Sequence, residues 1–168
     1  MKRIVSIAFA TAALAGSTLV LAPTAHAGDY TCRGTMNNRS FGGNVVVPSG
    51  ATCTLNGGYV DGNVKVYRGA TVYVNGTTVK GNLEGENHRH VSASRAYIDG
   101  NIQLKQGGSA TLTANRVDGD IQSFTNAGTQ VFRTNYVDGN LQCKSNRPAP
   151  TGGGNIVDGN KEDQCRRL

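Results

Sequence analysis

The chain has 168 residues, a length that suits a single domain, with a formal net charge of +6 and 17% charged residues. The basic residues are scattered and form no stripe interleaved with aromatic residues, which argues against nucleic-acid binding. Glycine is abundant, with 23 residues, and no segment keeps a helical apolar period over a useful length, which argues against a helical fold.

The N-terminal segment has the pattern of an export signal. Lys2 and Arg3 precede an apolar stretch from Ile4 to about Ala22, and Ala25-His26-Ala27 offers an Ala-x-Ala cleavage site. Polar residues dilute the apolar stretch and disfavour the alternative, a membrane anchor, and no later stretch is apolar enough to span a bilayer. We therefore expect residues 1–27 to be a signal peptide and the mature protein to be secreted, without a membrane span.

A repeated phrase related to Val-Asp-Gly-Asn-Val begins after residue 40. Residues 28–39, which precede it, show no repeat and are predicted to form an N-terminal cap. The phrase recurs around Gly43, Gly62, Gly81, Gly100, Gly119, Gly139 and Gly159. The steps between these glycines are 19 residues four times and then 20 residues twice. A near-constant period of this length indicates a repeat architecture.

Alternating apolar residues predict two or three short strands in each repeat. Aliphatic residues lie two positions before and two positions after the repeated glycine, as Val60 and Val64 do around Gly62. A second alternating run follows in the middle of the repeat, for example Val72 and Val74. Glycine-containing turns separate these runs, and glycine permits a positive φ where a corner demands it.

Two all-β architectures fit this pattern. In an antiparallel barrel or sandwich, each Asp-Gly would be a hairpin turn. In a single-stranded parallel β-helix, or β-solenoid, each repeat is one coil that must close in register on its neighbour, so constant spacing favours it. We predict about six to seven coils of 19–20 residues over residues 40–160. The polar residues 161–168 are predicted to form a C-terminal cap.

The four cysteines of this chain are predicted to form disulfides, because the chain is expected to be exported. Cys32 and Cys53 are 21 residues apart, and Cys143 and Cys165 are 22 residues apart. Each separation is close to one repeat, so sequential pairing would link neighbouring coils at each end of the stack. A metal site is a poor alternative, because the sequence has no Cys-x-x-Cys or Cys/His cluster.

The repeats from Ser40 to about Asn160 resemble the short-coil right-handed parallel β-helices of secreted bacterial proteins. They resemble more loosely the Gly-Asn-Val repeats of bactofilin-type polymer-forming solenoids. The expected export and the expected disulfides of this chain depart from that family. The segments Leu141 to Lys144, Pro148 to Asn155 and Lys161 to Cys165 are similar to the ending of a group of exported actinobacterial proteins of unknown function. Neither resemblance supplies a catalytic motif.

Two polar columns follow from the repeat. The asparagines of the phrase are predicted to bond along the stack, a structural role. The aspartates would repel one another at the spacing of neighbouring coils. Turn capping would relieve this repulsion, and calcium bound through oxygen ligands is the less favoured alternative. Lys80 interrupts the column, which disfavours a metal. No cofactor is therefore expected.

Alternation places tyrosines beside the aspartates on one outward side of the solenoid, and glutamines are predicted to extend that side. Tyrosines next to amides and carboxylates suit the stacking and hydrogen bonding of sugars. The alternative is a solvated face with aromatic packing between coils. The candidate glycan-binding residues are Tyr59, Tyr97, Tyr136, Asp99, Gln103 and Gln122.

One irregular repeat carries both Lys80 and the segment Asn87-His88-Arg89-His90. By phase, His88, His90, Lys80 and Arg95 could supply the base and the carboxylate-neutralising group of a polysaccharide lyase. The alternatives are a His-x-His metal pair, for which no third ligand is evident, and an exposed polar corner.

The sequence thus predicts an exported structural or adhesive β-solenoid at the cell surface or in the extracellular matrix, with cell-wall or extracellular polysaccharide as a candidate partner. A lyase-like, polysaccharide-active enzyme is the alternative. The oligomeric state stays open.

Overall fold

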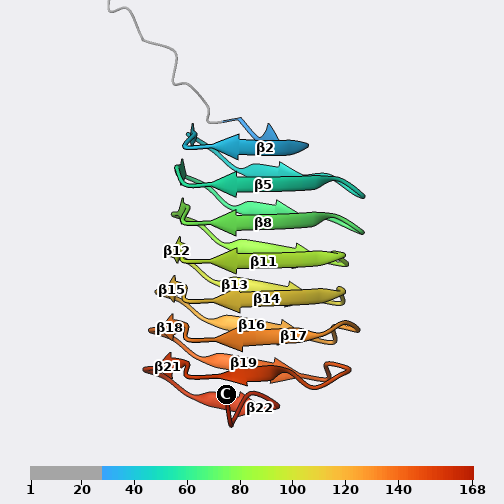
Figure 1. Ribbon diagram of the computed structural model, residues 1–168, viewed down its shortest axis with the longest axis vertical. Coiled ribbons are helices and arrows are strands. Elements are labelled where there is room, and N and C mark those ends of the chain that lie inside the picture. Colours follow the sequence, from blue (N-terminus) through green and yellow to red (C-terminus); the bar gives the residue numbers. More distant parts are fainter. Residues whose placement is uncertain (1–27) are drawn as a thin grey trace, which may run out of the picture.

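The computed structural model describes residues 28–168, which fold into an all-β solenoid of three parallel sheets without a helix (Figure 1). None of these residues therefore forms a helix that could cross a membrane. The export signal expected at residues 1–27 lies outside the described residues. The prediction of a single-stranded parallel β-helix is confirmed.

Each coil contributes one strand to each sheet. Sheet A contains β1 (Tyr30–Thr31), β4 (Val45–Val47), β7 (Val64–Val66), β10 (Leu83–Glu86), β13 (Ile102–Lys105), β16 (Ile121–Phe124), β19 (Leu141–Lys144) and β22 (Lys161–Asp163). Sheet B contains β2 (Gly34–Asn37), β5 (Thr52–Asn56), β8 (Thr71–Asn75), β11 (His90–Ser94), β14 (Ser109–Thr113), β17 (Gln130–Arg133) and β20 (Thr151–Gly153). Sheet C contains β3 (Ser40–Phe41), β6 (Tyr59–Val60), β9 (Thr78–Val79), β12 (Tyr97–Ile98), β15 (Arg116–Val117), β18 (Tyr136–Val137) and β21 (Ile156–Val157).

The strand register repeats the sequence period. Leu83 pairs with Val64 on one side and with Ile102 on the other, so equivalent residues of successive repeats are neighbours. Strand pairing extends beyond residues 40–160 at both ends, because β1 and β2 pair with β4 and β5, and β22 pairs with β19. These terminal segments therefore complete coils of the solenoid.

The core consists of columns of aliphatic side chains that point inward from the strands. One column, on sheet A, is fully buried and contains Val45, Val64, Leu83, Ile102, Ile121 and Leu141. Another, on sheet C, is fully buried at Val60, Val79, Ile98, Val117 and Val137. The strands of each inner coil pair with strands of the coil before and the coil after it. A single coil would leave these strand edges unpaired, which explains why the coils fold only as a set.

The asparagines of the repeated phrase form the expected ladder. The side-chain oxygen of Asn63 accepts a hydrogen bond from the backbone N–H of Asn82 at 2.7 Å, and Asn82 accepts from Asn101 at 2.7 Å. Asp120 continues the ladder by accepting from the N–H of Asn140 at 2.6 Å. Each side chain thus accepts a hydrogen bond from a backbone N–H at the corner of the next coil.

The glycine of the phrase has a different role from the one predicted. None of these glycines from Gly62 to Gly159 has a φ in the left-handed region. A Cβ at Gly100 would instead lie 2.5 Å from Oδ1 of Asn82 and 2.8 Å from the carbonyl oxygen of Gly81. Glycine is therefore required because the neighbouring coil approaches closely.

Two further ladders, at the other corners, are buried. At the corner between sheets B and C, Asn135 accepts from the N–H of Asn115 at 3.1 Å. At the corner between sheets A and B, Asn126 accepts from the N–H of Gly107 at 2.8 Å and donates to the carbonyl of Leu104 at 3.0 Å. The repeated phrase does not indicate these ladders, since they are confined to the later coils.

The disulfides join neighbouring coils near the two ends of the stack. Cys32 is bonded to Cys53 with a Cα–Cα distance of 5.6 Å, and Cys143 is bonded to Cys165 with a Cα–Cα distance of 5.2 Å. This is the sequential pairing expected from the spacing. It is compatible with an extracellular location.

Candidate functional site

The predicted tyrosines occupy one outward column of sheet C. Strand register places the column in the order Ser40, Tyr59, Thr78, Tyr97, Arg116, Tyr136 and Ile156. The three tyrosines are half-buried and occur in alternate coils. Two coils correspond to about 9.6 Å along the axis of the solenoid. The column therefore presents aromatic rings at a regular interval.

Each tyrosine hydroxyl donates to an aspartate at the corner between sheets C and A. Tyr59 donates to Asp61 at 3.1 Å, within the same coil. Tyr97 and Tyr136 donate one coil further on, to Asp118 and to Asp158, the latter at 2.7 Å. The aspartates thus fix the hydroxyl end of each ring.

Two cations lie among the aspartates. Lys80 Nζ lies 3.1 Å from Asp99, so the residue that interrupts the aspartate column neutralises one of its members. Arg116 Nε lies 3.1 Å from Asp118, and its guanidinium donates to Asp138 at 3.0 Å. The same guanidinium lies 4.8 Å from the centre of the Tyr136 ring, a distance at which a cation attracts the ring face.

These contacts replace the expected turn capping by the aspartates. Within residues 28–168, no backbone N–H donates to the carboxylates of Asp61, Asp99, Asp118, Asp138 or Asp158; the asparagine ladder caps the corners instead. Tyrosine hydroxyls, Lys80 and Arg116 offset the repulsion between carboxylates. No group of three His, Cys, Asp or Glu residues in this part of the chain could hold a metal ion.

The surroundings of this column keep its tyrosine hydroxyls and the Lys80 ammonium protonated near neutral pH. The hydrogen bond to Asp118 raises the pKa of Tyr97, and the bond to Asp158 raises that of Tyr136. For Tyr59, burial is the main cause of a raised pKa and the bond to Asp61 adds to it. The bond to Asp99 raises the pKa of Lys80. Lys80 is thus a cation here and is unsuited to act as a base.

The glutamines belong to another sheet. Gln103 and Gln122 point outward from sheet A, on the far side of the Asp-Gly-Asn corner from the tyrosines. Gln122 donates to Gln142 at 3.1 Å, and Gln142 donates to Glu162 at 3.2 Å. The residues predicted as one glycan site are therefore divided between two sheets, and Asp99 lies at the corner between them.

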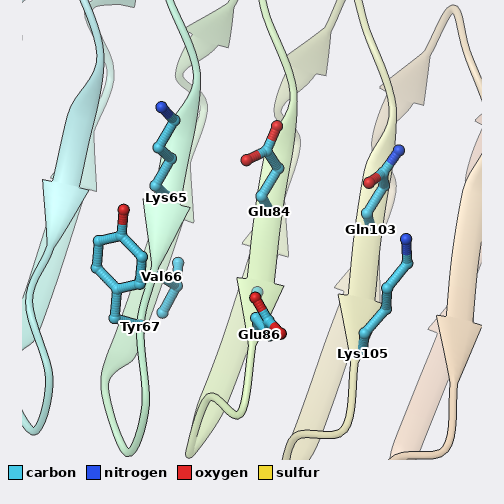
Figure 2. A pocket seen from close by; sticks show the side chains of 8 residues that line it. Lys65, Val66, Tyr67, Glu84, Glu86, Gln103 and Lys105 are labelled. Carbon is cyan, nitrogen blue, oxygen red and sulfur yellow. The ribbon is translucent and has the colours of Figure 1, made fainter.

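Gln103 lines a hollow of about 330 Å³ on sheet A. Figure 2 shows one row of side chains formed by Lys65, Glu84 and Gln103, and a second row formed by Tyr67, Glu86 and Lys105. Val66 lies between the two rows, and its partner in the neighbouring strand is Gly85. The four charged side chains form no ion pair within the described residues. This hollow can hold a small polar group by hydrogen bonds.

The structure distributes the lyase candidates over separate corners. Lys80 lies between sheets C and A, His88 between sheets A and B, and Arg95 between sheets B and C, while His90 opens β11. His88 is only 2% exposed, so the expected exposed corner is wrong for this residue. No hydrogen bond or ion pair joins these four side chains within residues 28–168.

His88 fills a gap in the core. The inward position of β10 is Gly85, and a Cβ there would lie 2.8 Å from Nδ1 of His88. Gly107, in the next coil, has no side chain and so leaves space for the His88 ring. The ring faces the backbone of Gly85, but neither ring nitrogen makes a well-formed hydrogen bond. Burial lowers the pKa of His88, an effect that the Gly85 backbone only partly opposes, so the imidazole is kept neutral.

Arg116 is a member of the sheet C column that the tyrosine pattern does not indicate. It occupies the column position in the coil between those of Tyr97 and Tyr136, so an alignment of the repeats in phase is the signal that locates it. No protein-family model, curated protein or solved structure gave a significant match to this chain.

Proposed function

We propose that the protein is an extracellular structural rod that binds an extended polysaccharide along sheet C. Two disulfides support an extracellular role, because such bonds persist in oxidising compartments. The solenoid supports a structural role, because stacked coils offer a long, regular surface on which a polymer can lie.

The observation that carries the proposal is the alternation of tyrosines. Tyr59, Tyr97 and Tyr136 recur every second coil, about 9.6 Å apart, which is close to the length of one disaccharide unit in an extended β-linked chain. Successive units of such a polymer would therefore meet successive rings in the same orientation. The bonded hydroxyls hold the rings in place, so little side-chain entropy is lost on binding.

The charge of the column favours a neutral or amine-bearing polymer. Five aspartates, from Asp61 to Asp158, outnumber the two cations Lys80 and Arg116. An acidic polysaccharide would be repelled by the uncompensated carboxylates. The net positive charge of the whole chain is therefore no guide to the ligand of this face.

Cosedimentation of the purified protein with insoluble neutral, amine-bearing and acidic polysaccharides tests the proposal. We expect Tyr97→Ala to weaken binding at least tenfold, and Tyr97→Phe, which keeps the ring, to weaken it much less. Tyr67→Ala, at an exposed tyrosine that directly follows β7 of sheet A, is the matched control and should bind as the unmodified protein does. Equal losses in Tyr97→Ala and Tyr67→Ala, or no binding to any polymer, would refute the proposal.

A further inference from the structure

Sheet B differs from the other two sheets in charge. The strands β2, β5, β8, β11 and β14 contain no Asp, Glu, Lys or Arg, and Arg133 of β17 is the first charged residue in the sheet. The strands β7, β10 and β13 of sheet A all carry charge, and sheet C is bordered by the aspartate column. An uncharged face over five successive coils is unusual for a protein surface, which is typically about one-quarter to one-third charged.

The outward positions of this face carry hydroxyls and amides in columns. The central column is Thr54, Tyr73, Ser92 and Thr111, in strand register. No hydrogen bond involves the side-chain hydroxyls of these four residues within residues 28–168, so they are free to bond a ligand. The spacing is about 4.8 Å between coils and about 6.8 Å between outward residues of one strand.

The borders of the central column are ordered. On one side, Asn75 donates to Asn56 at 2.9 Å and Asn56 donates to Asn37 at 2.9 Å. On the other side, Nδ1 of His90 lies 2.7 Å from the hydroxyl of Ser109. The face is therefore organised before any ligand arrives.

An aromatic pair lies at the centre of the face. The Tyr73 side chain is 38% exposed, and its ring centre lies 5.7 Å from that of His90. An exposed ring flanked by free hydroxyls offers both the apolar surface and the hydrogen-bonding groups that a sugar ring uses.

We propose that sheet B, from β2 to β14, is a second binding surface, specific for an uncharged polysaccharide. A single exposed ring, that of Tyr73, is a small apolar centre for a protein interface, and the strands lack the cations that nucleic acids require. Single hydroxyl contacts compete poorly with water, so a regular array gains most from a ligand that repeats and makes many contacts at once. This surface lies on a different sheet from the tyrosine column and does not depend on the function proposed for that column.

Binding of the purified protein to an insoluble neutral β-glucan, at low and high salt, tests this surface. We expect Ser92→Lys and Tyr73→Ser each to lower the affinity at least fivefold in a protein that already carries Tyr97→Ala, which removes the contribution of sheet C. Gln142→Lys, which adds the same charge to β19 of sheet A, should have no effect. The remaining binding should not change with salt, because the face has no charge to screen.

Three outcomes would overturn the proposal. They are unchanged affinity in both sheet B variants, a strong salt dependence of the remaining binding, and a dimer in light scattering that Ser92→Lys converts to a monomer. The last result would identify a second copy of the chain as the occupant. Thermal melting of each variant ensures that a loss of binding is not a loss of fold.

Discussion

At single positions of this solenoid, contacts with the neighbouring coil determine which residue type fits. The glycine of the repeated phrase has an ordinary φ, and its missing Cβ makes room for an amide and a backbone carbonyl. We expect Gly100→Ala to lower the free energy of unfolding by about 1–3 kcal/mol, because the contacting atoms of Gly81 belong to the backbone and cannot move away. Gly42→Ala is the control: its Cβ would meet nothing within 4 Å. Urea unfolding measures both variants, and equal costs would contradict the close-approach explanation.

His88 should make stability depend on pH. Burial lowers its pKa below the ordinary value of 6.5, so below that pH the unfolded chain binds a proton that the folded chain resists. Stability is therefore highest above pH 6.5 and falls as the pH decreases through it. We expect the urea midpoint to drop between about pH 8 and about pH 5, and His88→Gln to flatten this slope. His90→Gln should flatten it less, because burial of His90 is smaller and its ring bonds Ser109. An unchanged slope in His88→Gln would contradict this.

At the scale of elements, the amide ladders differ in how much they stabilise the fold, because some bond buried backbone groups and others join only side chains. Asn126 is buried and serves both the N–H of Gly107 and the carbonyl of Leu104. We expect Asn126→Ala to cost about 2–4 kcal/mol, because two buried backbone groups lose their partners. Asn56→Ala, at a ladder that joins only side chains, should cost less than about 1 kcal/mol. Chemical denaturation compares the two, and a ratio near one would show that the ladders are equivalent.

At the scale of the whole molecule, the stack should lose stability from its ends. Each disulfide closes a loop of about one coil, so removing one costs about 3 kcal/mol. Each coil contacts only its neighbours, so we expect the pair Cys143→Ser and Cys165→Ser to speed amide exchange in β19 and β22 while β8 and β11 stay protected. Uniform loss of protection along the chain would instead indicate a single cooperative unit.

Two binding faces on one rod would also make the protein a cross-linker. We expect the protein to aggregate suspended particles of a neutral polysaccharide, measured as turbidity. Tyr97→Ala and Ser92→Lys should each still bind but aggregate poorly, because each variant retains one face. Full aggregation by either variant would show that the two faces do not act as separate sites.

Much of this architecture can be read from the sequence alone, because in a parallel stack the residue one period away is the bonded neighbour. The 19–20-residue period therefore determined the coils, the inward aliphatic columns and the pairing of Cys32 with Cys53. Only the tertiary structure decided how the outward residues are divided among faces, because that depends on where each coil bends. Arg95 and Ala114, for example, adopt a positive φ at a corner where Gly76 does so in an earlier coil. The corner before sheet A separates Gln103 from Tyr97, and the space left by Gly85 draws His88 into the core. Such packing depends on contacts between coils, which no local sequence pattern predicts.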